Sequence, residues 1–282
     1  MLLTKADDDS TSSWITLGAE SKEELHKWIA AIRKCRDLTQ YLRSCRDCNQ
    51  ASPLKVVVDA CTTGSWRSLK FEHVRLTNSS ICALAVFLKR QVHAAKAKTK
   101  DVTEIIINNC GFSDDSCEVL LSVFESIPSL ERVRLPNNEI TDMGIRYITS
   151  SAVFNGTLIE LDLSHNHLTS YSAIRLSDLI FKSKLLKKID LSNNQIKVDG
   201  SIPLLNAIRD SGCPLEVLSL NGNELGDLGA LIVADIVKKN LKTLRILRLA
   251  HAKIGTKGME AIATAMYYCE AIQQGKRARV EL

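Results

Sequence analysis

The chain has 282 residues, of which 45% are hydrophobic, and a formal net charge of +5. This size and apolar content are sufficient for a continuous core, and no apolar stretch is long enough to predict a membrane span. The mild positive charge is dispersed among 32 acidic residues, which does not favour a nucleic acid ligand. The N-terminus lacks the features of a secretory signal, so we expect a cytoplasmic protein whose nine cysteines are reduced.

Residues 13–35 predict a strand, a turn and a helix. Ser21 and Glu24 have the spacing of a capping box, and an apolar stripe that includes Trp28 follows at helical spacing. The segment resembles the last strand and closing helix of a pleckstrin-homology domain, in which Trp28 would plug the barrel. We therefore assign residues 1–36 as a remnant of such a domain without its lipid site. The alternative is a helical cap for the repeats that follow.

Residues 37–65 are assigned as a linker and N-terminal capping region. Cys45 and Cys48 form a C-x-x-C pair, and Cys35 and Cys61 are nearby in sequence. A four-thiolate zinc site usually has a second such pair, and the glycine turns of zinc knuckles are missing here. We therefore favour bystander thiols on helices and expect neither a metal nor a cofactor.

From Trp66 to Ile254 the chain repeats the pattern L-x-x-L-x-L-x-x-N/C-x-L seven times. Successive copies start 36, 28, 28, 28, 29 and 29 residues apart, and one of them reads LIELDLSHNHL from Leu158. This pattern is typical of leucine-rich repeats. Positions four, six and eleven are expected to point inward, and one strand per repeat predicts a parallel sheet.

Position nine of the pattern is expected to turn the chain away from the strand, because a side-chain amide there can bond unpaired backbone groups. Asparagine occupies this position in four copies: Asn138, Asn166, Asn194 and Asn223. Cys110 is the usual substitute, whereas Val74 and Ala252 cannot make these bonds. Both ends of the array are therefore predicted to be atypical.

Each pattern is followed by apolar residues at three- and four-residue spacing, which predicts a helix. The helix starts at Asp142 and Asp227 carry Asp-x-Gly turns and resemble the ribonuclease-inhibitor-like subclass of leucine-rich-repeat proteins. The resemblance implies an α/β fold, a right-handed solenoid or horseshoe with a parallel concave sheet and convex helices. We assign the seven repeats to residues 66–272 and a truncated further repeat to residues 273–282, and we expect the chain to be a fragment of a longer protein.

The outward side chains of the predicted strands form a candidate protein-binding surface on the concave face. Its residues are Glu104, Arg132, Arg134, Glu160, Asp162, His165, Lys188, Asp190 and Arg248. We interpret the acidic pair Asp162 and Asp190, flanked by Arg132 and Arg134, as the centre of a partner footprint. The alternative is a solvated charge ladder that contributes little. Because Trp and Tyr are missing from these positions, a polar interface of moderate affinity is expected.

A second candidate is a basic protrusion in the repeat that is longer than its neighbours. Its residues are Lys89, Arg90, Lys96, Lys98 and Lys100. A solvated helix end and loop explains this run, and the alternative is a weak contact with an anionic membrane or an acidic partner. No aromatic residues interleave with the charges, so single-stranded nucleic acid is not expected.

The sequence contains no arrangement of nucleophile and base, no phosphate-binding glycine loop and no metalloprotease helix. It therefore predicts a non-catalytic scaffold that binds proteins rather than a small-molecule substrate. A pleckstrin-like remnant before ribonuclease-inhibitor-like repeats resembles the CARMIL actin regulators, which implies membrane- or cytoskeleton-associated control of actin. The alternative is a GTPase-activating regulator resembling the Ran activator, although the tail KRARVEL is basic where that family has an acidic one. A third interpretation, the sensor of an innate immune receptor, would need a nucleotide-binding module in the place of the remnant.

Overall fold

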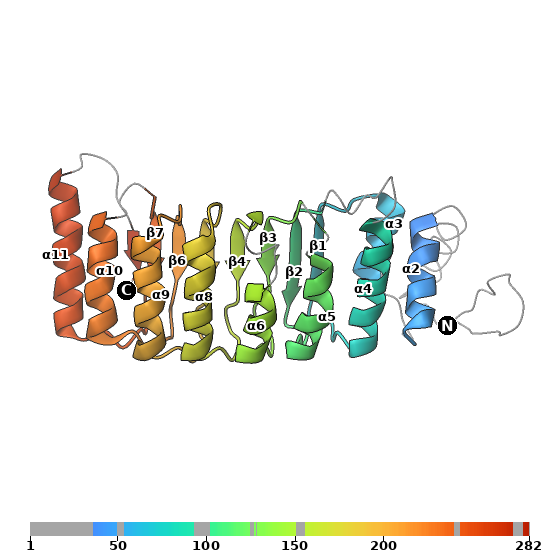
Figure 1. Cartoon of the computed structure of the whole chain (residues 1–282), viewed down its shortest axis with the longest axis horizontal. Helices are drawn as coiled ribbons and strands as arrows, with labels where there is room; N and C mark the ends of the chain where they lie inside the picture. The colour runs from blue at the N-terminus through green and yellow to red at the C-terminus, as the bar shows by residue number, and fades with distance from the viewer. Residues whose placement is uncertain are drawn as a thin grey trace, which may run out of the picture.

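Helices and strands alternate along an elongated array in the computed structural model of the chain (Figure 1). The structure describes residues 36–49, 54–92, 102–124, 127, 129–150, 156–239, 243–272 and 279–281. The strands are β1 (Ser68–Glu72), β2 (Glu104–Asn108), β3 (Arg132–Arg134), β4 (Glu160–Asp162), β5 (Lys188–Asp190), β6 (Val217–Ser219), β7 (Ile246–Arg248) and β8 (Arg279–Glu281). The helices are α2 (Arg36–Asp47), α3 (Lys55–Thr63), α4 (Asn78–Val92), α5 (Asp114–Phe124), α6 (Asp142–Ser150), α8 (Ser170–Lys182), α9 (Val198–Asp210), α10 (Gly226–Lys239) and α11 (Thr256–Ile272).

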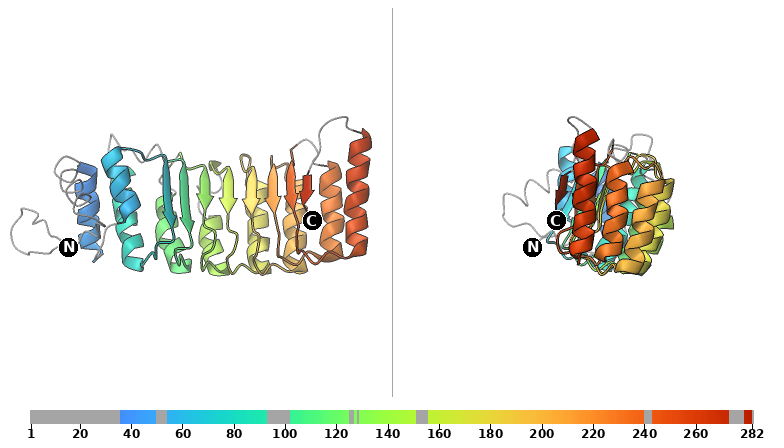
Figure 2. Two further views of the ribbon diagram at one scale, coloured as in Figure 1. Left: turned by 180° about the vertical axis from the view of Figure 1, so that it is seen from behind. Right: turned by 90° about the vertical axis from the view of Figure 1, so that its left-hand side faces the viewer.

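The strands form one parallel sheet in chain order from β1 to β8, and the helices of the repeats lie in a layer on one side of it (Figure 2). Equivalent pattern positions lie in register, so that Leu161 is flanked by Val133 and Ile189. These observations confirm the predicted α/β solenoid of leucine-rich repeats. Val280 in β8 lies opposite Leu247 and packs against the core, so the segment after the seventh repeat adds a strand to the sheet.

The core lies between the sheet and the helix layer. Pattern positions four, six and eleven fill it, as the fully buried Leu161, Leu163 and Leu168 show. Helix α8 contributes Leu176 and Ile180 from the opposite side. Complete burial of one such side chain stabilises the fold by about 1.5–3 kcal/mol, and each repeat buries its set against both neighbours.

The buried asparagine at position nine joins each repeat to the one before it. Asn166 Nδ2 donates to the carbonyl oxygens of Leu135 at 2.9 Å and Leu163 at 3.0 Å, and its Oδ1 accepts from the Ile140 N–H at 3.1 Å. The equivalent asparagines make equivalent bonds: Asn138, Asn194 and Asn223. In the first of the regular repeats Cys110 Sγ takes this role and donates to the Phe71 carbonyl at 3.3 Å.

Position eight requires a left-handed backbone, a constraint that was not predicted from the pattern. In every copy its backbone is left-handed, with φ between 53° and 66°. The residues at this position are His73, Asn109, Asn137, His165, Asn193, Gly222 and His251. Glycine, asparagine and histidine tolerate this conformation better than other residues, and the recurrence of these three types was a readable signal of the turn.

Aspartates at several helix starts form a second ladder on the helix side. Asp114 Oδ1 accepts from the N–H groups of Thr141 and Gly144, both at 2.9 Å, and so caps the helix of the next repeat. A Cβ atom on Gly144 would lie 2.5 Å from that oxygen. Asp142 and Asp227 cap the following repeats in the same way. The aspartate of one repeat thus binds the backbone of the next repeat. The glycine in that next repeat leaves room for this aspartate side chain.

The region assigned as a linker and capping region contains the helices α2 and α3. The Leu54 N–H donates to the hydroxyl of the buried Tyr41 at 2.9 Å, and the Tyr41 ring packs edge-on against Phe87 at 5.2 Å. These two helices therefore extend the core beyond β1. The pleckstrin-like segment, residues 13–35, lies outside the described residues and stays a prediction.

Replacing Asn166 by alanine is expected to destabilise the fold by about 2–4 kcal/mol, because several buried backbone groups lose their only side-chain partner. Urea unfolding followed by circular dichroism measures the change. His167→Ala is the control, since this neighbouring side chain is exposed, and it should cost less than about 0.5 kcal/mol. Equal stability of the two variants would show that the asparagine ladder contributes nothing.

Gly144→Ala is expected to destabilise the fold by about 1–3 kcal/mol, because the new methyl group displaces Asp114 from its helix cap. Gly156→Ala is the matched control, since a Cβ atom there meets nothing within 4 Å. Thermal unfolding should show a lower midpoint for the first variant only. A midpoint unchanged by Gly144→Ala would argue against close packing at the aspartate ladder.

Candidate protein-binding surface

The sheet face, the side of the sheet away from the helices, displays pattern positions three and five in two columns. Position three gives the column Ser68, Glu104, Arg132, Glu160, Lys188, Val217, Ile246. Position five gives the column Lys70, Ile106, Arg134, Asp162, Asp190, Ser219, Arg248, Glu281. Every predicted concave residue except His165 lies in these columns, and His165 occupies the turn after β4.

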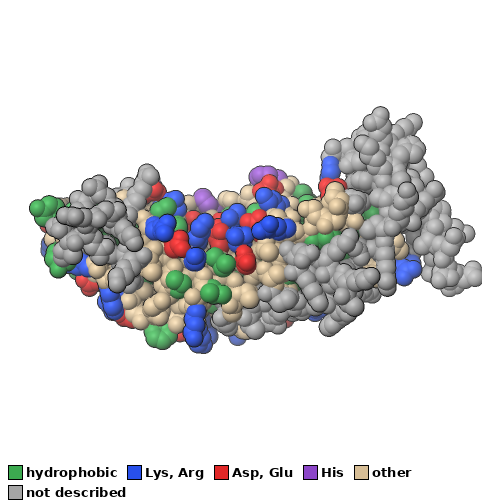
Figure 3. Space-filling model, turned by 90° about the horizontal axis from the view of Figure 1, so that it is seen from above, with side chains coloured by type: hydrophobic (Ala, Val, Ile, Leu, Met, Phe, Trp, Pro, Cys, Tyr) green, Lys and Arg blue, Asp and Glu red, His purple; other side chains and the backbone are tan. Residues whose placement is uncertain are grey.

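Most charges on this face neutralise one another. Arg134 Nε lies 2.9 Å from Glu160 Oε1, and its Nη1 lies 3.4 Å from Glu104 Oε1. The hydrogen bond that Arg134 donates to Glu160 is the main reason that the pKa of Arg134 is raised. Lys188 and Arg132 approach the same Glu160 at 3.9 and 4.0 Å. The arginines predicted to flank the acidic pair therefore pair with glutamates instead. Figure 3 shows basic and acidic side chains interleaved over the middle of the array.

Asp162 and Asp190 are adjacent in register and form no ion pair within the part of the chain that the structure describes. The backbone N–H and the hydroxyl of Ser164 donate to Asp162 Oδ1 at 2.9 and 2.7 Å, and the Ser192 N–H donates to Asp190 Oδ1 at 2.9 Å. Burial raises the pKa of Asp162, and the charge of Asp190 adds to this rise. The pair is held in place by serines. Arg134 acts on Asp162 only at longer range, and neither carboxylate forms an ion pair with a described residue.

The acidic pair borders a shallow hollow of about 250 Å³ on the sheet face. Val217 and Ile246 line it with partly exposed apolar side chains, and Arg248 lines it while held by Glu281 at 2.9 Å. Val217, Ser219 and Ile246 were not predicted, although they occupy the same pattern positions as the predicted residues. The signal for the predicted surface was charge, which these three side chains lack.

The other sequence candidates are placed only in part. Lys89 is exposed near the end of α4, whereas Lys96, Lys98 and Lys100 lie outside the described residues, so the basic protrusion stays a prediction. Burial raises the pKa of the Cys45 thiol to about 11. The described residues contain no group of three His, Cys, Asp or Glu side chains placed to hold a metal, and Cys35 lies outside them. Among the helices that the structure describes, none has the length and apolarity to cross a membrane.

Comparison with known proteins finds similarity in the repeats. A family described as Leucine Rich repeat matches residues 154–176, 212–231 and 240–263. Ribonuclease inhibitor from Sus scrofa is 27% identical over 172 residues, which are 61% of this chain and 38% of that protein. NACHT, LRR and PYD domains-containing protein 14 from Homo sapiens is 29% identical over 164 residues, 57% of this chain and 15% of that protein. Protein 9 of the same series from Bos taurus is 24% identical over 236 residues, 82% of this chain and 23% of that protein.

The chain spans less than two fifths of the length of these relatives. The similarity therefore concerns the repeat array and its use as a binding scaffold, and it does not transfer the activity of the whole relatives.

Asp162→Asn is expected to leave the fold at least as stable as the original at pH 7. The asparagine keeps an acceptor for Ser164 and removes a carboxylate whose ionised form is disfavoured by burial and by Asp190. The pKa of the Asp162 carboxyl is higher in the folded chain than in the unfolded chain, so ionisation of this group lowers the free energy of unfolding when the pH exceeds the folded-state pKa. The loss disappears when the pH falls below the pKa of the carboxyl in the unfolded chain, about 3.9. Urea unfolding of both proteins at pH 7 and pH 3.5 should show the difference shrinking at the lower pH. A clear loss of stability at pH 7 would contradict this account of the pair.

Proposed function

We propose that the chain is a non-catalytic protein-interaction scaffold whose partner binds the sheet face at the hollow beside Asp162 and Asp190. The observation that carries this proposal is the unpaired acidic pair in a surface whose other charges are largely neutralised. A partly buried carboxylate without a cationic partner is costly, and an arriving arginine or lysine removes that cost.

The hollow also favours a particular kind of partner segment. Val217 and Ile246 offer apolar contact next to the two carboxylates. A partner segment with a basic side chain beside an apolar one would pair with the carboxylates and pack on the apolar side chains of the hollow at the same time. Arginine suits the pair better than lysine, because its guanidinium can bridge two carboxylates with parallel hydrogen bonds.

One candidate partner follows from the relatives. The relative from Sus scrofa bears the name ribonuclease inhibitor, so a ribonuclease is the first purified protein to test. Inhibition of ribonuclease activity by the chain, lost when the acidic pair is reversed, would identify that partner. Unchanged ribonuclease activity would exclude this partner and leave the scaffold proposal to the capture experiment below.

Two narrower roles are predicted from the sequence: a link to actin regulation at membranes, and activation of a GTPase. The link to actin regulation and membranes depends on residues 13–35 and on the basic protrusion, and binding to purified actin regulators and anionic vesicles tests it. The GTPase-activating alternative rests on the shared repeat subclass. A GTP-hydrolysis assay with a panel of small GTPases tests that alternative.

Reversing the acidic pair with Asp162→Lys and Asp190→Lys is expected to abolish capture of the specific partner from cell lysate. The control reverses two exposed acids away from the sheet face, Glu139→Lys and Glu260→Lys, and changes the net charge equally. Affinity capture with quantitative mass spectrometry compares the three baits. Loss of the same proteins from both variants, or from neither, would contradict a partner site at the hollow.

A further inference from the structure

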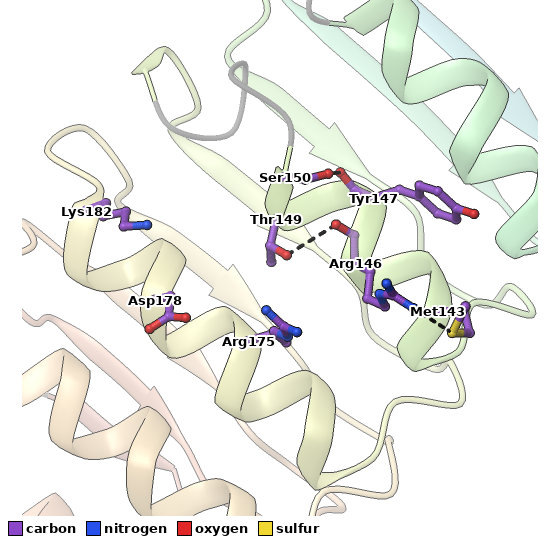
Figure 4. A pocket seen from close by; sticks show the side chains of 8 residues that line it. All are labelled: Met143, Arg146, Tyr147, Thr149, Ser150, Arg175, Asp178 and Lys182. Atoms are coloured by element: carbon purple, nitrogen blue, oxygen red, sulfur yellow. Dashed lines mark hydrogen bonds between the residues drawn. The ribbon is translucent and has the colours of Figure 1, made fainter.

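A groove separates two neighbouring helices on the side of the molecule opposite the sheet face. It has a volume of about 440 Å³ and lies between α6 and α8. Its lining residues are Met143, Arg146, Tyr147, Thr149, Ser150, Arg175, Asp178 and Lys182. Figure 4 shows the side chains of Arg146 and Arg175 extending into the gap from the two helices, with Lys182 further along α8.

The groove carries positive charge that the described residues do not neutralise. Arg146, Arg175 and Lys182 line it against a single carboxylate, Asp178, and none of the three cations forms an ion pair in the described part of the chain. Arg146 Nη1 donates a hydrogen bond to the sulfur of Met143 at 3.7 Å. The sheet face differs, because Arg134 and Arg248 there are each held by a glutamate at 2.9 Å.

Arg175 is held in place without losing its charge. Its Nη2 donates to the Tyr171 hydroxyl at 3.0 Å, and its Cζ lies 5.4 Å from the centre of the Tyr171 ring. Neither contact supplies a negative charge, but both restrict the guanidinium to one edge of the groove. Less side-chain entropy is therefore lost when an anionic group binds there.

Beside these cations α8 exposes an apolar stripe. Tyr171, Ile174 and Phe181 are 43%, 46% and 61% exposed, and their spacing of three and seven residues places them on one outward face of the helix. Across the groove Met143 of α6 is 49% exposed. The three side chains of α8 lie on the outer surface of the helix and not in the lining of the groove, so a partner that contacts them must extend from the groove over α8.

We propose that the groove between α6 and α8 is a second docking site, which takes an acidic amphipathic helix of a partner protein. The apolar side chains of that helix pack on Tyr171, Ile174 and Phe181, and its carboxylates meet Arg146, Arg175 and Lys182. This is the helix-in-groove mode of recognition. Charge complementarity selects an acidic partner over a second copy of this chain, whose net charge is +5. The groove lies on the helix layer and the hollow lies on the sheet face. Binding at the groove can therefore be tested separately from binding at the hollow.

The test uses a fluorescein-labelled sixteen-residue peptide with leucines at helical spacing and glutamates on its other faces, titrated against the full chain by fluorescence anisotropy. Saturable binding is expected, and Arg146→Glu with Arg175→Glu should weaken it at least about tenfold. The matched control, Lys238→Glu with Lys257→Glu, reverses two exposed lysines on α10 and α11. It should weaken binding less than about threefold, because it changes only the overall charge. Phe181→Ala should weaken binding about fivefold through the apolar stripe.

Four outcomes would overturn the proposal. The first is no saturable binding of the peptide up to about 1 mM, the weakest affinity class of specific binding. The second is equal weakening by the groove variant and its control, which would reduce the effect to overall charge. The third is equal binding of a peptide of the same composition with the leucines scrambled, because the apolar stripe would then play no part. The fourth is tighter binding to phosphatidylserine vesicles than to the peptide, lost in the groove variant, which would assign the groove to a membrane surface.

Discussion

The side-chain hydrogen bond from one repeat to the backbone of the repeat before it is the interaction on which this structure depends. At the end of each short strand the chain turns away, and the turn leaves buried backbone groups that helix and sheet do not pair. Asn166 satisfies groups of two successive repeats with one amide. On the helix side Asp114 does the same for the next helix start. These two ladders join successive repeats over most of the array. Val74 and Ala252 lack the amide in the terminal copies, and Ser170 stands in place of the aspartate at the start of α8.

The fixed register in turn separates stability from recognition. Positions four, six, nine and eleven are committed to the core and its turns, whereas positions three and five face away from it. On those free positions Arg134 and Glu160 neutralise each other, and Asp162 and Asp190 remain unpaired. Asp162 is half-buried and forms no ion pair among the described residues. A carboxylate of that kind is expected where binding rather than folding determines the side chain.

The sequence predicted the fold well because the repeat pattern records buried, geometrically constrained positions. It also placed Asp162 and Asp190 in neighbouring strands, since strand spacing follows from the repeat alone. It could not predict that Arg134 turns toward Glu104 and Glu160, because the direction of a long side chain depends on all its neighbours. Val217 and Ile246 were overlooked for lack of charge, although the repeat phase locates them. The groove between α6 and α8 depends on how consecutive helices pack, and no spacing in the sequence encodes that gap.

The array therefore offers two faces of different character, an acidic hollow on the sheet and a basic, partly apolar groove on the helices. The most direct test of the sheet face as the primary partner surface is lysine cross-linking with mass spectrometry of the complex captured from lysate. The account predicts cross-links from the captured partner to Lys70 and Lys188, which are exposed on the sheet face. Cross-links confined to Lys238 and Lys257 on the helix layer, with none to Lys70 or Lys188, would contradict it.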